Sequence, residues 1–229
     1  MKAKFKYETI ITISLIIIYI LINSYCMNNF GLFNIKSLLL NLLLSISIII
    51  FILKNKLLEY YNLTKIPNFK KYLYFIPLLL IISVNLWNGI NINKSFNEII
   101  IYILIMINVS FLEEIIFRGF LFKMLEQDNY KSAIIVSSLT FGIGHIINLL
   151  TGSLLISTIL QVLYATTTGF LFSLIVYKGK SLWPPIICHI LTNVLSIFYV
   201  ETFLLSYIIP LFLIVVSSLY SIYIIKKIK

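Results

Sequence analysis

The sequence predicts an all-α protein, a polytopic membrane helical bundle of about eight transmembrane helices. Hydrophobic residues make up 60% of the 229-residue chain, charged residues make up 11%, and the mean hydropathy is +1.03. A soluble domain of this size could not bury so much apolar surface, so lipid must surround most of it. The apolar runs are continuous and not alternating, which is typical of membrane helices and excludes a β-barrel.

Eight apolar segments approach the roughly 20 residues that are needed to cross a bilayer. Their approximate bounds are 8–27, 37–53, 72–90, 97–122, 132–150, 153–177, 182–200 and 203–225. The breaks between them carry turn-forming residues such as Asn28 to Gly31, Asn88-Gly89 and Thr151-Gly152. We therefore predict one integral membrane domain over residues 1–229, with no soluble domain.

The first segment follows a basic N-terminus, Met1–Lys6, as it does in a signal peptide. It is nearly long enough to span the membrane, however, and no small-x-small cleavage site follows it. We expect an uncleaved first span. The second and third segments carry no residues that point to chemistry.

Lysine placement predicts the orientation of the chain. If the N-terminus is cytoplasmic, fifteen of the seventeen lysines lie in cytoplasmic segments, and only Lys36 and Lys94 lie outside. This asymmetry follows the positive-inside rule, so we expect a multi-pass protein of the cell membrane with both termini in the cytoplasm. The net charge of +10 comes from short connections, which favours anionic lipid and not nucleic acid as the partner of the basic residues.

The fourth segment, 97–122, carries an adjacent acid pair and an arginine. Ionisable side chains are costly inside a membrane, so each is a candidate functional residue. Glu114 and Arg118 are four residues apart and can pair on one helix face. Glu113 projects about 100° away from Glu114, so we expect it to remain unpaired and to act as a general base. A structural ion pair with a stray glutamate is the alternative.

The only two histidines lie in the fifth and seventh segments. Phe141, His145 and Asn148 share one stripe of 132–150, where Gly142 and Gly144 would let a neighbouring helix approach closely. His189 and Asn193 share one face of the helix that Trp183-Pro184-Pro185 opens. A lone histidine in an apolar helix is more often a packing residue, but two of them, each with a polar neighbour, favour a site.

The remaining two segments offer little chemistry. In 153–177, Gln161, Ala165, Gly169 and Ser173 recur every four residues, which predicts a tight helix contact with Gln161 as a supporting donor. The eighth segment carries nothing diagnostic. Counting 1.5 Å per residue, Glu113, His145 and His189 reach a similar depth in the cytoplasmic half of the bilayer, so we expect one shared, water-filled site.

Three motifs carry a resemblance to a known family. Glu-Glu-x-x-x-Arg at 113–118, Phe-x-x-x-His at 141–145 and His-x-x-x-Asn at 189–193 occur in order on successive apolar segments. This set resembles the type II CAAX prenyl endopeptidase and bacteriocin-processing (CPBP, Abi) family of intramembrane proteases. The resemblance covers a catalytic core of about 97–200 and implies a membrane-embedded protease.

The resemblance also implies a role for each motif residue. Glu113 and His145 would activate the attacking water, Glu114 and Arg118 would form a supporting ion pair, and His189 and Asn193 would stabilise the oxyanion or help to hold a metal. One carboxylate and two histidines, Glu113, His145 and His189, would suit one Zn²⁺ with an open coordination position. The residues equally permit a metal-free glutamate mechanism, and the chain has no HExxH zinc motif.

Two other classes of function remain open at the level of sequence. An ion-coupled transporter would also place Glu and His at mid-membrane, although we find neither internal repeats nor matched broken helices. A non-catalytic membrane protein for bacteriocin self-immunity could retain the same motifs. For a protease, the partner is a peptide or protein at the bilayer: a bacteriocin or pheromone precursor, or a CAAX-like C-terminus. The oligomeric state is not predicted.

Overall fold

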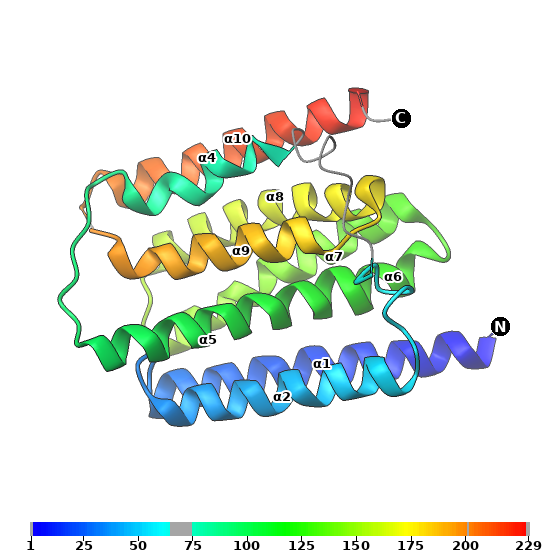
Figure 1. Cartoon of the computed structure of the whole chain (residues 1–229). Helices are drawn as coiled ribbons and strands as arrows, with labels where there is room; N and C mark the ends of the chain where they lie inside the picture. Colours follow the sequence, from blue (N-terminus) through cyan, green and yellow to red (C-terminus); the bar gives the residue numbers. More distant parts are fainter. Residues whose placement is uncertain (1, 65–74, 201, 228–229) are drawn as a thin grey trace.

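The computed structural model describes residues 2–64, 75–200 and 202–227, and its regular elements over these ranges are all helical. They are α1 (Lys2–Asn29), α2 (Ile35–Lys54), α4 (Leu78–Ser83), η2 (Val84–Leu86), α5 (Phe96–Glu114), η3 (Ile115–Leu121), α6 (Phe122–Glu126), α7 (Tyr130–Gly144), η4 (His145–Thr151), α8 (Leu155–Gly179), α9 (Trp183–Leu195), η5 (Ser196–Phe198) and α10 (Leu205–Lys227). Successive segments run back and forth along one bundle axis (Figure 1). The prediction of a polytopic helical bundle is confirmed.

Six of the described helical segments are long and apolar enough to cross a membrane. They correspond to the predicted segments 8–27, 37–53, 97–122, 132–150, 153–177 and 203–225. The other two are shorter than predicted: 182–200 is represented by Trp183–Phe198, and 72–90 by the short helices α4 and η2. Residues 72–74 of that third segment lie outside the described residues.

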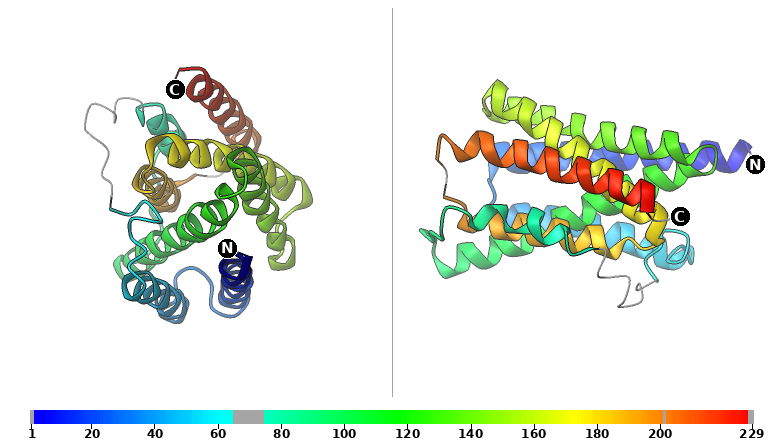
Figure 2. Two further views of the ribbon diagram at one scale, coloured as in Figure 1. Left: turned by 90° about the vertical axis from the view of Figure 1, so that its right-hand side faces the viewer. Right: turned by 90° about the horizontal axis from the view of Figure 1, so that it is seen from above.

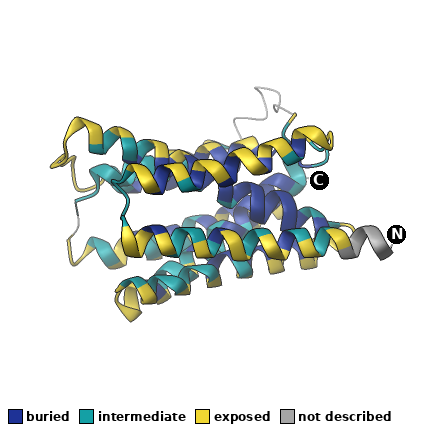
Figure 3. Cartoon of the chain, turned by 90° about the horizontal axis from the view of Figure 1, so that it is seen from below, coloured by how far each residue is buried: buried dark blue, intermediate teal, exposed yellow. Residues whose placement is uncertain are grey.

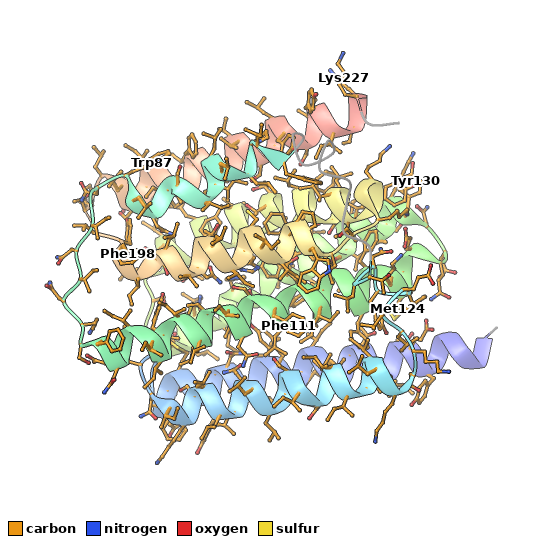
Figure 4. All side chains as sticks on the ribbon, viewed as in Figure 1. Trp87, Phe111, Met124, Tyr130, Phe198 and Lys227 are labelled. Atoms are coloured by element: carbon orange, nitrogen blue, oxygen red, sulfur yellow. The ribbon has the colours of Figure 1, made fainter. Side chains whose placement is uncertain are left out.

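The two short segments pack against each other: α4 and η2 contact α9, and η2 also contacts η5. The side-chain amide of Asn85 donates to the carbonyl oxygen of Thr192 at 2.7 Å, and that of Asn88 donates to the carbonyl of Val200 at 3.1 Å. The first bond satisfies one of the last four carbonyl groups of α9, which have no partner inside an α-helix, and the second holds the chain just beyond η5. Figure 4 shows Trp87 and Phe198 at this end of the bundle and Lys227 at the opposite end.

The first described helix begins, and the last one ends, at the same end of the bundle (Figure 1). This arrangement follows from an even number of antiparallel segments. It places both ends on the same side of a membrane, whichever side that is. Their cytoplasmic location stays a prediction, and Lys65, Lys70, Lys71 and Lys229, which contribute to it, lie outside the described residues.

The helices form a bundle around a central stretch of the α5–η3–α6 segment (Figure 2). Large apolar side chains cover its outside, for example Leu43 and Leu219, which are more than 60% exposed. A surface of this kind suits lipid and not water. The buried residues concentrate inside, nearest to the end that carries both termini (Figure 3). Glu114 and Arg118, both at 0% exposure, belong to this buried region.

The helix that carries the acid pair changes its winding directly after that pair. Residues Ile115–Leu121 form a π-helical turn in which every residue is buried. Such turns leave backbone groups without their usual partners and are frequent at functional sites. The hydroxyl of Ser137, on the neighbouring helix α7, donates to the carbonyl oxygen of Phe117 at 2.8 Å and so ties this turn to α7.

Candidate active site

Residues from three separate motifs line one cavity of about 400 Å³. Glu113 comes from the end of α5, His145 from the start of η4, and His189 and Asn193 from α9. The rest of the lining comes mainly from α4, α8 and α10. The polar groups that the sequence places at a similar membrane depth therefore meet in one hollow space. We call it the His189 cavity.

Glu114 and Arg118 form the ion pair that their spacing predicts. The guanidinium Nη1 donates to Oε1 of Glu114 at 2.9 Å, and both side chains are fully buried. The guanidinium also lies over the ring of Phe141, with Cζ 4.1 Å from the ring centroid. A Cβ at Gly169 would lie 2.8 Å from the guanidinium Nη2, so the glycine makes room for this cation. The small residue in α8 thus serves the ion pair as well as helix packing.

His189 lies between the two carboxylates. Its Nδ1 is 2.8 Å from Oε1 of Glu114, and its Nε2 is 3.3 Å from Oε2 of Glu113. Since carboxylate oxygens are acceptors, a protonated imidazole would donate to both. The four formal charges, two negative on the glutamates and two positive on Arg118 and this imidazolium, then sum to zero. Such compensation is what a buried ionic cluster requires.

Glu113 is not unpaired, contrary to the prediction. The phenol of Tyr19 donates to its Oε1 at 2.5 Å, and His189 faces its other oxygen. The prediction considered only partners on the same helix, whereas Tyr19 is 94 residues away on α1. The side chain nevertheless differs from Glu114 as expected: it is 14% exposed and lines the cavity, whereas Glu114 is fully buried.

The ring of His145 is held in one tautomer by the backbone. Its Nδ1 lies 3.0 Å from the carbonyl oxygen of Phe141. A carbonyl can only accept, so Nδ1 carries the hydrogen and Nε2 of the neutral ring carries the lone pair. His145 is thereby prepared to accept a proton at Nε2. One turn further on, Asn148 donates to Oε1 of Gln161 at 2.8 Å. This contact leaves the amide nitrogen of Gln161 free of Asn148, and its role as a supporting donor stays a prediction.

Asn193 is positioned by a buried serine. Its Nδ2 lies 3.0 Å from Oγ of Ser110, which is fully buried on α5. An amide nitrogen has two hydrogens, and this contact uses one of them. The side chain lines the same cavity as His189, as their shared helix face predicts.

The two glycines of the 132–150 segment differ in their surroundings. A Cβ at Gly142 would clash with the hydroxyl of Thr166 and lie 2.9 Å from the carbonyl oxygen of Val162, so Gly142 does allow α7 and α8 to approach closely. At Gly144 an added Cβ would meet nothing within 4 Å. The prediction of a close helix contact at Gly144 is therefore wrong.

Sequence reasoning missed two residues that contact the motif side chains, Tyr19 and Ser110. Both lie on segments of ordinary apolar composition, and the chain has 15 tyrosines with no pattern that separates this one. The spacing of Ser110 and Glu114, four residues on one helix, was the only available signal. For Tyr19 we find no signal in the sequence.

We expect Tyr19→Phe to lower the turnover of peptide cleavage by about 10- to 100-fold with little change in KM. A hydrogen bond to a charged group is worth about 1.5–3 kcal/mol, and this one holds the Glu113 carboxylate. Kinetics with a fluorogenic peptide would measure the split between kcat and KM. Tyr25→Phe, on an exposed position of the same helix, is the matched control. Unchanged turnover in Tyr19→Phe would show that the phenol does not position Glu113.

The metal-ligand set Glu113, His145 and His189 stays a prediction. No group of three or more His, Cys, Asp or Glu side chains is placed to hold an ion over the described residues. Nδ1 of His189 faces Glu114, and Nδ1 of His145 faces the carbonyl oxygen of Phe141. The Nε2 atoms of the two histidines and the carboxylate of Glu113 are therefore the atoms left to bind a metal. These atom types suit zinc.

Comparison with known proteins identifies the motif-bearing core. Residues 95–195 match the family model described as type II CAAX prenyl endopeptidase Rce1-like. The motif-bearing core of this chain is therefore similar to that family. The matched range contains all three motifs and overlaps the predicted core, 97–200.

A curated relative is similar to part of the chain. The protein named "Putative membrane peptidase YdiL" of Bacillus subtilis (strain 168) is 35% identical over 83 residues. The alignment covers 36% of this chain and 30% of the relative, so it spans less than a third of the relative's length. No solved structure matches the chain.

Proposed function

We propose that this chain is an intramembrane endopeptidase, which cleaves a peptide bond of a membrane-associated peptide with a water molecule activated by Glu113 and His145. The observation that carries the proposal is the meeting of Glu113, His145, His189 and Asn193 in one cavity of about 400 Å³. The similarity of residues 95–195 to the endopeptidase family and the relative's name, a putative membrane peptidase, support the same class of reaction.

Both proposed water-activating groups, Glu113 and His145, are oriented so that each can accept a proton. Glu113 is a cavity-facing carboxylate that Tyr19 and His189 orient, and His145 carries a lone pair on Nε2. Either can accept the proton of a water molecule that attacks the carbonyl carbon. The accepted proton then passes to the amine that leaves. Water and the peptide are the only reactants in these steps.

His189 and Asn193 suit the second requirement of peptide hydrolysis, donors for the oxyanion. The ring is fixed by Glu114 and the amide by Ser110, so both donors are oriented before substrate arrives. Preorganised donors lower the barrier because they need no reorientation as negative charge develops. The ion pair with Arg118 keeps Glu114 in place and acts through His189.

Zinc is not part of this proposal, because the described side chains are not grouped as metal ligands. Bound Zn²⁺ would supply Lewis-acid activation of water. We expect the purified protein to retain cleavage activity after exhaustive chelation and to contain no stoichiometric metal by elemental analysis. One tightly bound zinc per active chain, lost in His189→Ala together with all activity, would assign His189 as a ligand instead.

Asn193→Ala is expected to lower kcat by about 10²–10³-fold and to leave measurable activity, as the loss of one oxyanion donor does. Asn193→Asp should be less active still, because its negative charge opposes the oxyanion. Ser110→Ala is the matched control, since it removes the acceptor that orients Asn193 but keeps the donor. It should cost less than Asn193→Ala. Equal activity of Asn193→Ala and wild type in kinetic assays would exclude the oxyanion role.

The proposed function is tested by reconstituting the purified chain into vesicles with candidate substrates. Unprenylated precursor peptides with apolar leaders form one arm, and prenylated CAAX-like peptides form the other. We propose the first class as substrate, with new termini identified by mass spectrometry. Cleavage of the prenylated peptides alone would reverse this choice. No cleavage in either arm would favour a transporter or a non-catalytic immunity protein.

A further inference from the structure

A second cavity lies next to the first and shares its reactive residues. It has a volume of about 270 Å³, and we call it the Tyr19 cavity. Four residues line both cavities: Glu113, Phe141, His145 and Gln161. The candidate base and the candidate histidine therefore stand where two hollow spaces meet, and not at the closed end of one.

The other walls of the two cavities come from different helices. Tyr19, Asn23 and Met27 of α1 and Met106 and Val109 of α5 belong only to the Tyr19 cavity. Helices α4, α9 and α10 contribute only to the His189 cavity. Helices α1 and α10 lie on opposite sides of the bundle (Figures 1 and 2). The two cavities thus extend from the reactive residues toward different sides.

Gly144 shows that the Tyr19 cavity keeps space beside the reactive histidine. This glycine lines the cavity, precedes His145, and has a helical φ of −52° that any residue can adopt. An added Cβ would meet nothing within 4 Å. Neither backbone conformation nor helix packing requires glycine here, and glycine is less favourable than alanine in a helix. Space for a ligand close to the backbone is the remaining physical reason.

The walls of both cavities are chemically alike. Among the described residues, their lining is mostly apolar, Glu113 is its only carboxylate, and no lysine or arginine contributes. A charged side chain placed in either cavity would lose its hydration without gaining a partner of opposite charge beyond the reaction centre. Apolar and small polar side chains are the groups that both cavities can accept.

The geometry points to an extended, apolar polypeptide segment as the ligand, which crosses the Glu113–His145 junction and places residues in both cavities. This inference rests on the proposed proteolytic function. Residues on one side of the scissile bond occupy the His189 cavity, and residues on the other side occupy the Tyr19 cavity. The chain then cleaves inside a polypeptide, and it selects apolar residues on both sides of the bond.

A larger side chain introduced into one cavity at a time tests which side of the scissile bond each cavity binds. Gly144→Leu fills the Tyr19 cavity and Ser206→Leu, on α10, fills the His189 cavity. With a randomised peptide pool, we expect each variant to reduce cleavage of peptides with large residues on one side of the bond by about 10- to 200-fold. Gly144→Leu and Ser206→Leu should affect opposite sides of the scissile bond. Gly144→Ala should show a smaller change in the same direction as Gly144→Leu.

Ile135→Phe adds bulk to an exposed position of α7 that lines neither cavity and should keep wild-type preferences. The inference would be overturned if Gly144→Leu and Ser206→Leu both reduced cleavage of peptides with large residues on the same side of the scissile bond. It would also be overturned if Gly144→Leu kept the wild-type residue preferences on both sides.

Protection of introduced cysteines from maleimide labelling tests this inference separately from the proposed function, because the protection requires that peptide binds but not that it is cleaved. Gly144→Cys and Ser206→Cys, each combined with Glu113→Gln, would be labelled with a maleimide before and after addition of the same pool. Native Cys26 and Cys188 are buried, at 3% and 2% exposure. We expect peptide to protect both new thiols.

Protection of only one thiol, or of neither, would overturn the two-cavity inference even if the wild type cleaves peptides. A wild type that cleaves nothing, together with protection of both thiols, would contradict the proposed function and leave the two-cavity binding mode standing.

Discussion

Replacing Glu113 by glutamine is expected to lower kcat for peptide cleavage by at least about 10²–10⁴-fold, the usual contribution of a general base. Glutamine keeps the size of the side chain and an oxygen that can accept from Tyr19. Glu113 is not the partner of Arg118, and His189 keeps the nearer carboxylate of Glu114, so no buried cation is left without a carboxylate. We therefore expect the variant to insert into the membrane and to melt close to the wild-type temperature.

Glu98→Gln is the matched control for this variant. Glu98 lies at the other end of α5, where it forms a capping box with Ser95, and glutamine can replace it there. It should retain wild-type activity. Substantial proteolysis by Glu113→Gln, measured with a fluorogenic peptide, would contradict its role as base and favour Glu114.

Glu114→Gln is expected to destabilise the protein by about 3–5 kcal/mol and to abolish activity as well. Removing one partner of a buried ion pair leaves the other charge uncompensated. Here Arg118 is fully buried, and His189 loses the carboxylate that faces its Nδ1. A lower melting temperature of the purified protein, measured beside Glu113→Gln, checks this expectation.

The double variant Glu114→Gln/Arg118→Met separates stability from catalysis. It removes the uncompensated cation and should recover part of the lost stability, because an apolar replacement of a buried pair is often tolerated. It should not recover activity, since His189 still lacks its carboxylate partner. A Glu114→Gln variant that melts like the wild type would show that the ion pair does not support the site.

Local features of the site could be predicted from the sequence. The Glu114–Arg118 contact follows from a four-residue spacing on one helix, and it forms at 2.9 Å. The shared cavity of His189 and Asn193 follows from the same rule. The apolar segments also appear as helices near their expected positions, because bilayer thickness constrains their length and composition.

Contacts between distant segments could not be predicted in the same way. The approach of His189 to Glu114 spans 75 residues, and that of Tyr19 to Glu113 spans 94. Both depend on how the helices rotate and pack, which hydropathy does not determine. The π-helical turn after Glu114 and the open space beside Gly144 likewise arise from packing.

Isotope labelling with a trapping nucleophile tests the central claim, direct attack of water on the peptide bond, most directly. The purified wild type would cleave a peptide in ¹⁸O-labelled water that contains hydroxylamine, and mass spectrometry would analyse both products and protein. We expect a new C-terminal carboxylate that carries one ¹⁸O atom, with no hydroxamate and no peptide bound to the protein. A hydroxamate product, a covalent peptide–protein adduct or the absence of any cleavage would contradict direct attack by water.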